Sequence, residues 1–159
     1  RLHLTMAGLR RTGSYAALMF LDLDNFKPLN DQHGHEWGDL LLMEVGRRLT
    51  ASVRAGDTVA RFGGDEFVVL LPDIDASSAQ QVAEKIRAEV EGQKIPYPES
   101  VAGPWLTVSL GGATQVPSGV EVDARLFGEA DRVLYEAKGS GRNRAVWSAA
   151  GDATNQVRV

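Results

Sequence analysis

Three acidic residues in two separate segments have the chemistry needed to bind a divalent cation. Asp22 ends an apolar run, and Asp65 and Glu66 follow Gly63 and Gly64 between two further apolar runs. If those runs form a hairpin beside the first strand, the carboxylates converge and repel one another unless a cation lies between them. Oxygen ligands in a chain with no cysteine and three histidines favour Mg²⁺ or Mn²⁺ over Zn²⁺. Alternatively, the acidic tip is a solvated Gly-Gly-Asp turn.

A basic pair near the C-terminus could hold phosphates. Lys138 and Arg142 lie four residues apart on either side of Gly139-Ser140-Gly141, where glycines allow a ligand to approach the backbone. Alternatively, Lys138 is a helix C-terminal cation that complements the helix dipole. Neither the Walker pattern nor the Rossmann glycine pattern occurs, so a nucleotide would have to be held in another way.

Two polar residues could recognise a base. Asn30 and Asp39 flank a segment that contains His33 and His35. A carboxylate can accept hydrogen bonds from both adjacent donors of guanine, which adenine does not present. Alternatively, Asn30 caps a helix and Asp39 is solvated. The two histidines do not share a helix face, which favours structural or capping roles over metal binding.

Arg54 and Asp57 form a further pair, three residues apart and just before the glycine pair. Taken alone, this spacing indicates an exposed ion pair that contributes about 0–1 kcal/mol. Only a family context would give the pair a function.

Length and composition indicate one soluble globular domain. The chain has 159 residues, of which 43% are hydrophobic and 24% charged, and its net charge is −4. An acidic chain does not fit nonspecific binding to a nucleic-acid backbone. The longest apolar stretch, residues 16–21, is much shorter than the ~20 residues of a membrane helix. Absence of cysteine fits a reducing compartment, and we expect a cytoplasmic protein.

Periodicity predicts the elements that position these residues. Strands are expected at 16–23, 58–62, 67–71, 106–110 and 145–147, and helices at 1–12, 27–31, from 36 to about 55, from 77 to about 91, and 124–138. Ser77 and Ser78, each followed by Gln three residues later, are the expected helix-capping residues. We predict a single α+β domain over 1–147, palm-like with a ferredoxin-like core, in which helices flank a mainly antiparallel sheet. Residues 148–159 are expected to be a tail or linker.

The motifs together resemble one family. They are LDLDNFK (21–27), ND (30–31), GH (34–35), GD (38–39), RFGGDEF (61–67), AD (130–131), LYEAK (134–138) and GRN (141–143). This set resembles the GGDEF domain, the diguanylate cyclase family, over residues 16–147. The resemblance implies a palm-like fold related to class III nucleotide cyclases. The family's upstream turn is absent from the chain, so we expect a longer parent protein with sensory or effector domains.

The resemblance also implies a role for each site residue. The implied Mg²⁺ or Mn²⁺ ligands are Asp22, the carbonyl of Leu23, Asp65 and Glu66. Implied substrate contacts are Asn30 and Asp39 to guanine, Lys27, Lys138 and Arg142 to phosphates, and Gly63 and Gly64 in the hairpin. Asp65 and Glu66 are the two candidates for the general base.

The implied reaction condenses two GTP molecules into cyclic di-GMP and two pyrophosphates, with one GTP in each subunit of a homodimer. Arg54 and Asp57 fall where the family places its RxxD product-inhibition site, so cyclic di-GMP is expected both as product and as inhibitor. The alternative is a noncatalytic module that binds GTP or cyclic di-GMP within a larger signalling protein.

Overall fold

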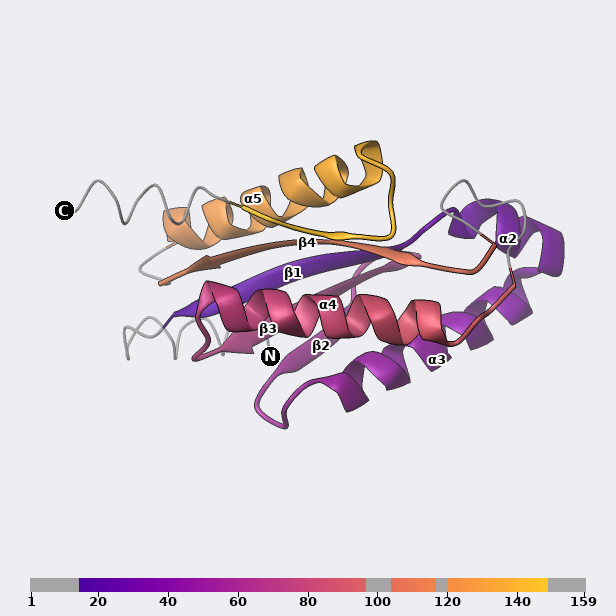
Figure 1. The fold of residues 1–159 in the computed structure, drawn as a ribbon, viewed down its shortest axis with the longest axis horizontal. Coiled ribbons are helices and arrows are strands. Elements are labelled where there is room, and N and C mark those ends of the chain that lie inside the picture. The colour runs from indigo at the N-terminus through magenta and orange to yellow at the C-terminus, as the bar shows by residue number, and fades with distance from the viewer. Residues whose placement is uncertain (1–14, 97–103, 117–119, 149–159) are drawn as a thin grey trace.

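The computed structural model describes residues 15–96, 104–116 and 120–148 of the chain (Figure 1). Its elements, in chain order, are β1 (Ala16–Leu23), α2 (Phe26–His33), α3 (His35–Ser52), β2 (Thr58–Arg61), β3 (Glu66–Pro72), α4 (Ala76–Gly92), β4 (Val108–Gln115), α5 (Val120–Gly139) and β5 (Ala145–Trp147). The expected helix over 1–12 and nearly all of the expected tail lie outside the described residues. Ser148, the first residue of that tail, is described and buried.

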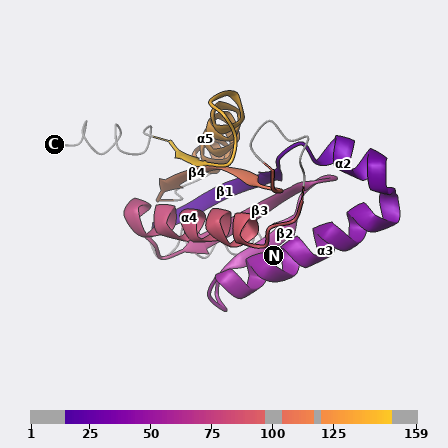
Figure 2. The same ribbon diagram turned by 45° about the vertical axis from the view of Figure 1, so that its right-hand side comes forward.

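The five strands form one sheet in the order β2-β3-β1-β4-β5. All neighbouring pairs are antiparallel except β4 and β5, which are parallel. Helix α5 covers one face of the sheet, while α3 and α4 lie on the opposite side (Figures 1 and 2). The prediction of helices around a mainly antiparallel sheet is therefore confirmed.

Strand β1 is central and buried on both faces, which explains its continuous apolar sequence. Its odd-numbered residues Ala17, Met19 and Leu21 belong to the core beneath α3 and α4. Its even-numbered residues join the smaller core beneath α5. The same alternation carries Asp22 to the α5 face, where its register partners are Glu66 on β3 and Ser109 on β4.

The glycine pair in β4 lies inside the strand, whereas the sequence predicted that the strand would end before it. A Cβ at Gly111 would lie 2.1 Å from the backbone nitrogen of Leu134 in α5, and one at Gly112 would lie 2.2 Å from the ring of Trp147. Glycine is therefore needed at both positions for close packing rather than for a turn.

A prediction about helix capping was also wrong. Helix α4 begins at Ala76 and is capped by Asp75, whose carboxylate accepts a hydrogen bond from the Ser78 backbone N–H at 2.7 Å, so neither serine is the cap. In α3, Leu40 is 66% exposed, so it does not belong to the buried face that Leu41, Leu42, Val45 and Leu49 form.

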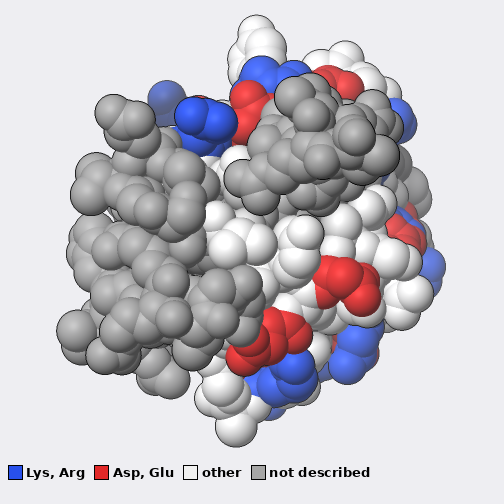
Figure 3. Space-filling view, turned by 90° about the vertical axis from the view of Figure 1, so that its left-hand side faces the viewer, with Lys and Arg blue, Asp and Glu red and all other residues white. Residues whose placement is uncertain are grey.

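Charged side chains of both signs are visible on one face of the molecule (Figure 3). On the face drawn in Figure 3, the visible basic side chains lie among acidic ones rather than in one patch. Among the described residues, no helix is both long enough and apolar enough to cross a membrane.

Candidate active site

Asp22 is a buried carboxylate with an incomplete set of partners. It is 7% exposed, and its Oδ2 atom accepts a hydrogen bond from Lys138 Nζ on α5. Its other oxygen, Oδ1, is buried and has no hydrogen-bond partner. Burial is the main reason that the pKa of Asp22 rises from 3.8 to about 6; Lys138 opposes the rise and the Asp65 carboxyl adds to it. A cation beside Oδ1 would complete this arrangement.

Asp65 lies at the hairpin tip close to Asp22, as the sequence predicted. Both line a cavity of about 260 Å³, together with Leu23, Lys27, Lys138 and Arg142 among other residues. Within the described ranges, no cluster of three or more His, Cys, Asp or Glu side chains is arranged to hold a metal. Two carboxylates and a carbonyl match the sparse protein ligation typical of Mg²⁺, for which substrate phosphates and water complete the shell.

Glu66 occupies a different position from Asp65. It pairs with Asp22 across the strands and is half-buried, but it lines neither of the two cavities at this end of the sheet. A Cβ built on Gly63 would lie 3.7 Å from Glu66 Oε2, so the Glu66 side chain folds back toward the turn. Asp65 is therefore the better placed of the two toward Asp22.

Asp24, only two residues after Asp22, is fully satisfied by protein donors. Its carboxylate accepts hydrogen bonds from Thr107 Oγ1 at 2.7 Å, Ser109 Oγ at 2.6 Å and the Asn143 backbone N–H at 3.0 Å. It is 2% exposed. This carboxylate has a structural role: it joins the end of β1 to β4 and to the loop that carries Arg142.

Asn30 and Asp39 line one cavity of about 360 Å³, as expected for a pair that binds the same base. Asn30 lies inside α2, and the N-cap residues of α2 and α3 are Asn25 and Gly34, so the capping alternative considered from the sequence is wrong. Instead, Asn30 Nδ2 lies 3.1 Å from His35 Nδ1. A Cβ on Gly38 would lie 1.8 Å from Asn30 Oδ1, which shows that the amide packs directly on the glycine.

Asp39 is exposed, in agreement with the alternative that its side chain is solvated, but a cation lies near it. Arg61 NH2 lies 3.9 Å from its Oδ1 and also donates to the Gly64 carbonyl at 2.7 Å. Arg61 thus links the Asp39 carboxylate to the hairpin tip. Gly64 lines this cavity, whereas Gly63 turns the chain with a φ of 81°.

The two cavities adjoin because Phe26, Lys27 and Asp65 line both. Lys27 is exposed at the start of α2, and Lys138 and Arg142 enter the smaller cavity from α5 and the loop after it. All three cations expected to hold phosphates therefore lie around the acidic pair. Along the joined cavities, the polar residues Asn30 and Asp39 line one part, and the cations and carboxylates line the other.

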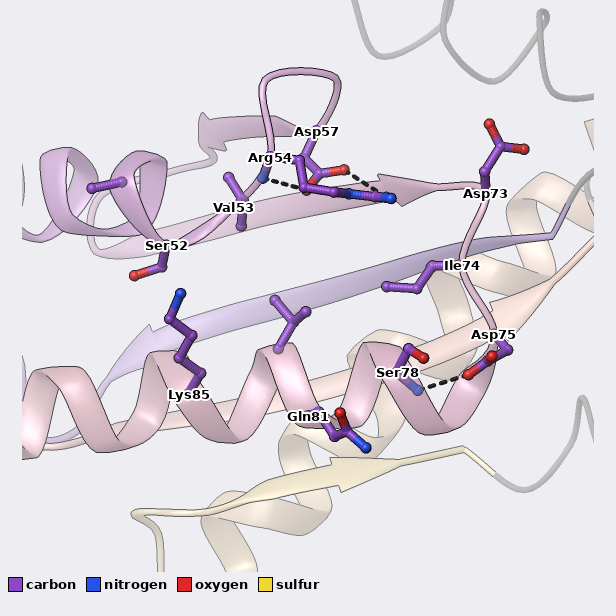
Figure 4. Close-up of a pocket in the computed structure, with 12 residues that line it drawn as sticks. Ser52, Val53, Arg54, Asp57, Asp73, Ile74, Asp75, Ser78, Gln81 and Lys85 are labelled. Carbon is purple, nitrogen blue, oxygen red and sulfur yellow. Dashed lines mark hydrogen bonds and ion pairs between the residues drawn. The ribbon is translucent and has the colours of Figure 1, made fainter.

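Arg54 and Asp57 line a separate and larger cavity of about 750 Å³ (Figure 4). Asp57 is 8% exposed; its carboxylate accepts from the Arg54 backbone N–H at 2.8 Å and lies 3.2 Å from the Arg54 guanidinium. Helix α4 supplies the facing wall, with Ser78, Gln81 and Lys85. The Asp57 carboxylate is thus buried while the Arg54 side chain is exposed, so the pair is not the fully exposed ion pair considered from spacing alone.

Sequence reasoning did not single out Arg61 or give His35 a place in the base cavity. Arg61 is the first residue of the RFGGDEF motif, and an arginine two residues before a Gly-Gly turn was a usable signal. His35 was weighed only as a metal ligand or cap, because nothing in its spacing predicts the contact with Asn30.

Comparison with known proteins agrees with this arrangement. The sequence pattern of the family described as "Diguanylate cyclase, GGDEF domain" matches residues 1–144. Diguanylate cyclase A of Treponema denticola is 39% identical over 132 residues, covering 83% of this chain and 35% of that protein. The response regulator PleD of Caulobacter vibrioides is 38% identical over 138 residues, covering 87% of this chain and 30% of that protein. The chain thus spans about a third of these relatives.

Solved structures show the same fold. One is the crystal structure of the coiled coil and GGDEF domain of DgcB from Caulobacter crescentus in complex with cyclic di-GMP. It matches this chain with a TM-score of 0.80 and 29% sequence identity, and the match covers 92% of this chain and 76% of that one. The active GGEEF domain of a Vibrio cholerae diguanylate cyclase gives 0.77 at 27% identity, covering 91% and 89%. The predicted palm-like fold is confirmed, and the chain belongs to the GGDEF domain family of diguanylate cyclases.

Proposed function

We propose that this chain is a diguanylate cyclase domain, which condenses two GTP molecules into cyclic di-GMP and two pyrophosphates. The observation that carries the proposal is the adjoining pair of cavities at one end of the sheet. Asn30 and Asp39 offer guanine an amide and a carboxylate, and Lys27 and Asp65 line both cavities where the base site meets the phosphate site. A nucleotide can therefore place its base and its phosphates in one continuous space.

The residues present fit a divalent metal. Asp22, the Leu23 carbonyl and Asp65 would hold Mg²⁺ or Mn²⁺, and the unpartnered Asp22 Oδ1 is the atom that lacks a ligand. When bound, the metal neutralises charge on the phosphates and activates the attacking hydroxyl. Glu66 would assist a second metal or the proton transfer from its position opposite Asp22.

The chain's own cations orient the triphosphate. Lys27, Lys138 and Arg142 border the cavity on different sides, so they can contact different phosphate oxygens. Lys138 is paired with Asp22 without nucleotide, and a phosphate would compete for it. Asp65 is the better placed acceptor for the proton of the attacking 3′-hydroxyl, and Glu66 is the other candidate.

Catalysis by this geometry requires two copies of the chain. The joined cavities offer one base site and one phosphate site, whereas the reaction consumes two GTP molecules, each attacking the α-phosphate of the other. Two domains must therefore meet with their sites facing, at least transiently, and we propose a catalytic homodimer.

We further propose that cyclic di-GMP inhibits the enzyme through Arg54 and Asp57. The Arg54 side chain is 59% exposed at the edge of the large cavity, where its guanidinium can bind a phosphate or a guanine edge. An Arg54→Ala variant should bind cyclic di-GMP more weakly in calorimetry while keeping GTP turnover. Unchanged affinity for cyclic di-GMP would overturn this assignment.

The activity is tested by following cyclic di-GMP production from GTP and Mg²⁺ by chromatography at several protein concentrations, with Asp65→Ala as control. A rate per molecule that rises with concentration and vanishes in the control is expected from a dimeric cyclase. If the protein binds cyclic di-GMP but neither binds nor turns over GTP, even when dimerised artificially, it is instead a noncatalytic regulatory module.

We also propose that this domain is part of a longer protein. MucR of Pseudomonas aeruginosa, described as a bifunctional diguanylate cyclase and cyclic di-GMP phosphodiesterase, matches this chain over only 18% of its length. We propose that sensory or effector domains accompany this domain as well, and that it acts in the cytoplasm.

A further inference from the structure

The side chain of Asn143, in the loop after α5, is held by two residues of α4. Its Oδ1 accepts a hydrogen bond from Arg87 NH1 at 2.8 Å, and its Nδ2 donates to Glu91 Oε2 at 2.6 Å. An amide that accepts on one side and donates on the other has only one orientation in this position. These contacts join segments more than fifty residues apart in the sequence.

Arg87 is itself fixed by two carboxylates of its own helix. Its guanidinium contacts Glu84 at 2.6 Å and Glu91 at 3.2 Å, one turn before and one turn after it. Its side chain is 17% exposed, so these are partly buried charge-assisted bonds. Arg87 and Glu91 thus present a rigid donor and acceptor to Asn143.

The loop that this contact holds has an uncommon backbone. Arg142 and Asn143 have φ values of 62° and 46°, in the left-handed region that few non-glycine residues occupy. The Arg142 N–H donates to the Ala137 carbonyl at 3.0 Å and the Asn143 N–H donates to Asp24, while the amide contacts of Asn143 tie the loop to α4. Of these hydrogen bonds, only the Asn143 amide contacts join the loop to α4, so their loss would loosen the backbone next to Arg142.

We propose that Arg87 and Glu91 are positioning residues, which act through Asn143 to place the guanidinium of Arg142 against the substrate phosphates. The inference rests on the proposed function, because Arg142 is assigned to phosphate there. It assigns a role to α4, which lines neither of the two adjoining cavities and which no part of the sequence analysis connected to the site.

The test is a double-mutant cycle on GTP binding, measured by calorimetry. Arg87→Met should weaken GTP binding about tenfold, as expected for loss of a partly buried charged hydrogen bond. In an Arg142→Ala background the same change should have no further effect, whereas Lys27→Ala should still weaken binding there. Equal loss from Arg87→Met in both backgrounds, or no loss in either, would overturn the proposal.

Arg132→Met is the matched control. Arg132 of α5 also pairs with glutamates three residues before and four after it, but it is 56% exposed and none of its hydrogen bonds reaches the loop. It should leave GTP binding unchanged. Asn143→Ala removes the contact from its other end and should reproduce the effect of Arg87→Met.

Hydrogen exchange of residues 139–144 without nucleotide provides a readout that does not depend on activity. Exchange should quicken in Arg87→Met and not in Arg132→Met, because only the first frees the loop. If the wild-type chain bound no GTP while this difference appeared, the proposed function would fail and the positioning contact would stand. Identical exchange in the two variants would refute the contact itself.

Discussion

Replacing Asp22 and Asp24 separately by asparagine should change stability in opposite directions, although the two residues are close in sequence and both are buried. Asp22 has one oxygen without a partner and a pKa raised to about 6. Asp24 accepts three hydrogen bonds from β4 and the loop after α5. Negative charge is therefore unfavourable at Asp22 in the metal-free protein and stabilising at Asp24.

The size of the effect at Asp22 follows from its pKa. Burial raises the pKa from 3.8 to about 6, and each pKa unit corresponds to about 1.4 kcal/mol, so the ionised side chain destabilises the folded state by about 3 kcal/mol. Between those two pH values the folded protein holds a proton that the unfolded chain has lost, so stability falls as pH rises through this window. Above the window, Asp22→Asn should be more stable by up to about 3 kcal/mol. At lower pH the difference should disappear.

The corresponding change at Asp24 removes charge-assisted hydrogen bonds and turns an amide donor toward groups that donate. Asp24→Asn should lower the free energy of unfolding by about 2 kcal/mol or more, since hydrogen bonds to charged groups contribute about 1.5–3 kcal/mol. Urea unfolding in a chelating buffer at pH 5 and pH 7.5 measures both variants. A destabilised Asp22→Asn protein at pH 7.5 would refute the reasoning.

The effect of Mg²⁺ on stability should also differ between the Asp22→Asn and Asp24→Asn variants. Mg²⁺ at a hundredfold excess over its Kd should stabilise the wild-type protein by about 2.7 kcal/mol. Asp22→Asn should lose this response because it lacks the carboxylate, whereas Asp24→Asn should keep most of it. Equal responses in the two variants would place the metal elsewhere.

Three further substitutions test the base cavity and the packing of α5. Gly38→Ala should lower GTP affinity at least tenfold with the fold retained, because the new methyl group occupies the place of the Asn30 amide oxygen; calorimetry alongside circular dichroism checks this. Asp39→Ala should reduce the preference for GTP over inosine triphosphate, which lacks the 2-amino donor, and an unaltered ratio of kcat/KM would remove Asp39 from base recognition. Gly111→Ala should cost about 2 kcal/mol or more in urea unfolding, because its methyl group meets the α5 backbone; wild-type stability would contradict the close approach.

Much of the site was predictable because it depends on alternation along strands. The apolar run of β1 indicated a strand buried on both faces, and the Gly-Gly pair indicated a hairpin beside it. Together these imply that Asp22 and Asp65 converge, and the register of β1 with β3 places Asp22 opposite Glu66. The helical spacing of α5 likewise predicted that Lys138 ends a helix, although not that it pairs with Asp22.

The remaining features depend on contacts between distant segments, which local patterns do not encode. Asp22 and Asp24 have the same residue type in the same run, yet one is satisfied by donors 83 to 119 residues away and the other is not. The glycines of β4 looked like a turn because the helix and ring that require them come later in the chain.

The difference between Asp22 and Asp24 explains how a carboxylate with an incomplete set of hydrogen bonds can persist at the buried end of β1. A buried carboxylate with one unpartnered oxygen destabilises the metal-free fold when it is ionised, whereas Asp24 uses its charge to fasten β4 and the Arg142 loop to the end of β1. Asp24 therefore holds the surrounding backbone in place, and Asp22 keeps an oxygen that can bind a ligand. A site with both carboxylates satisfied would be more stable but would leave no oxygen for a cation.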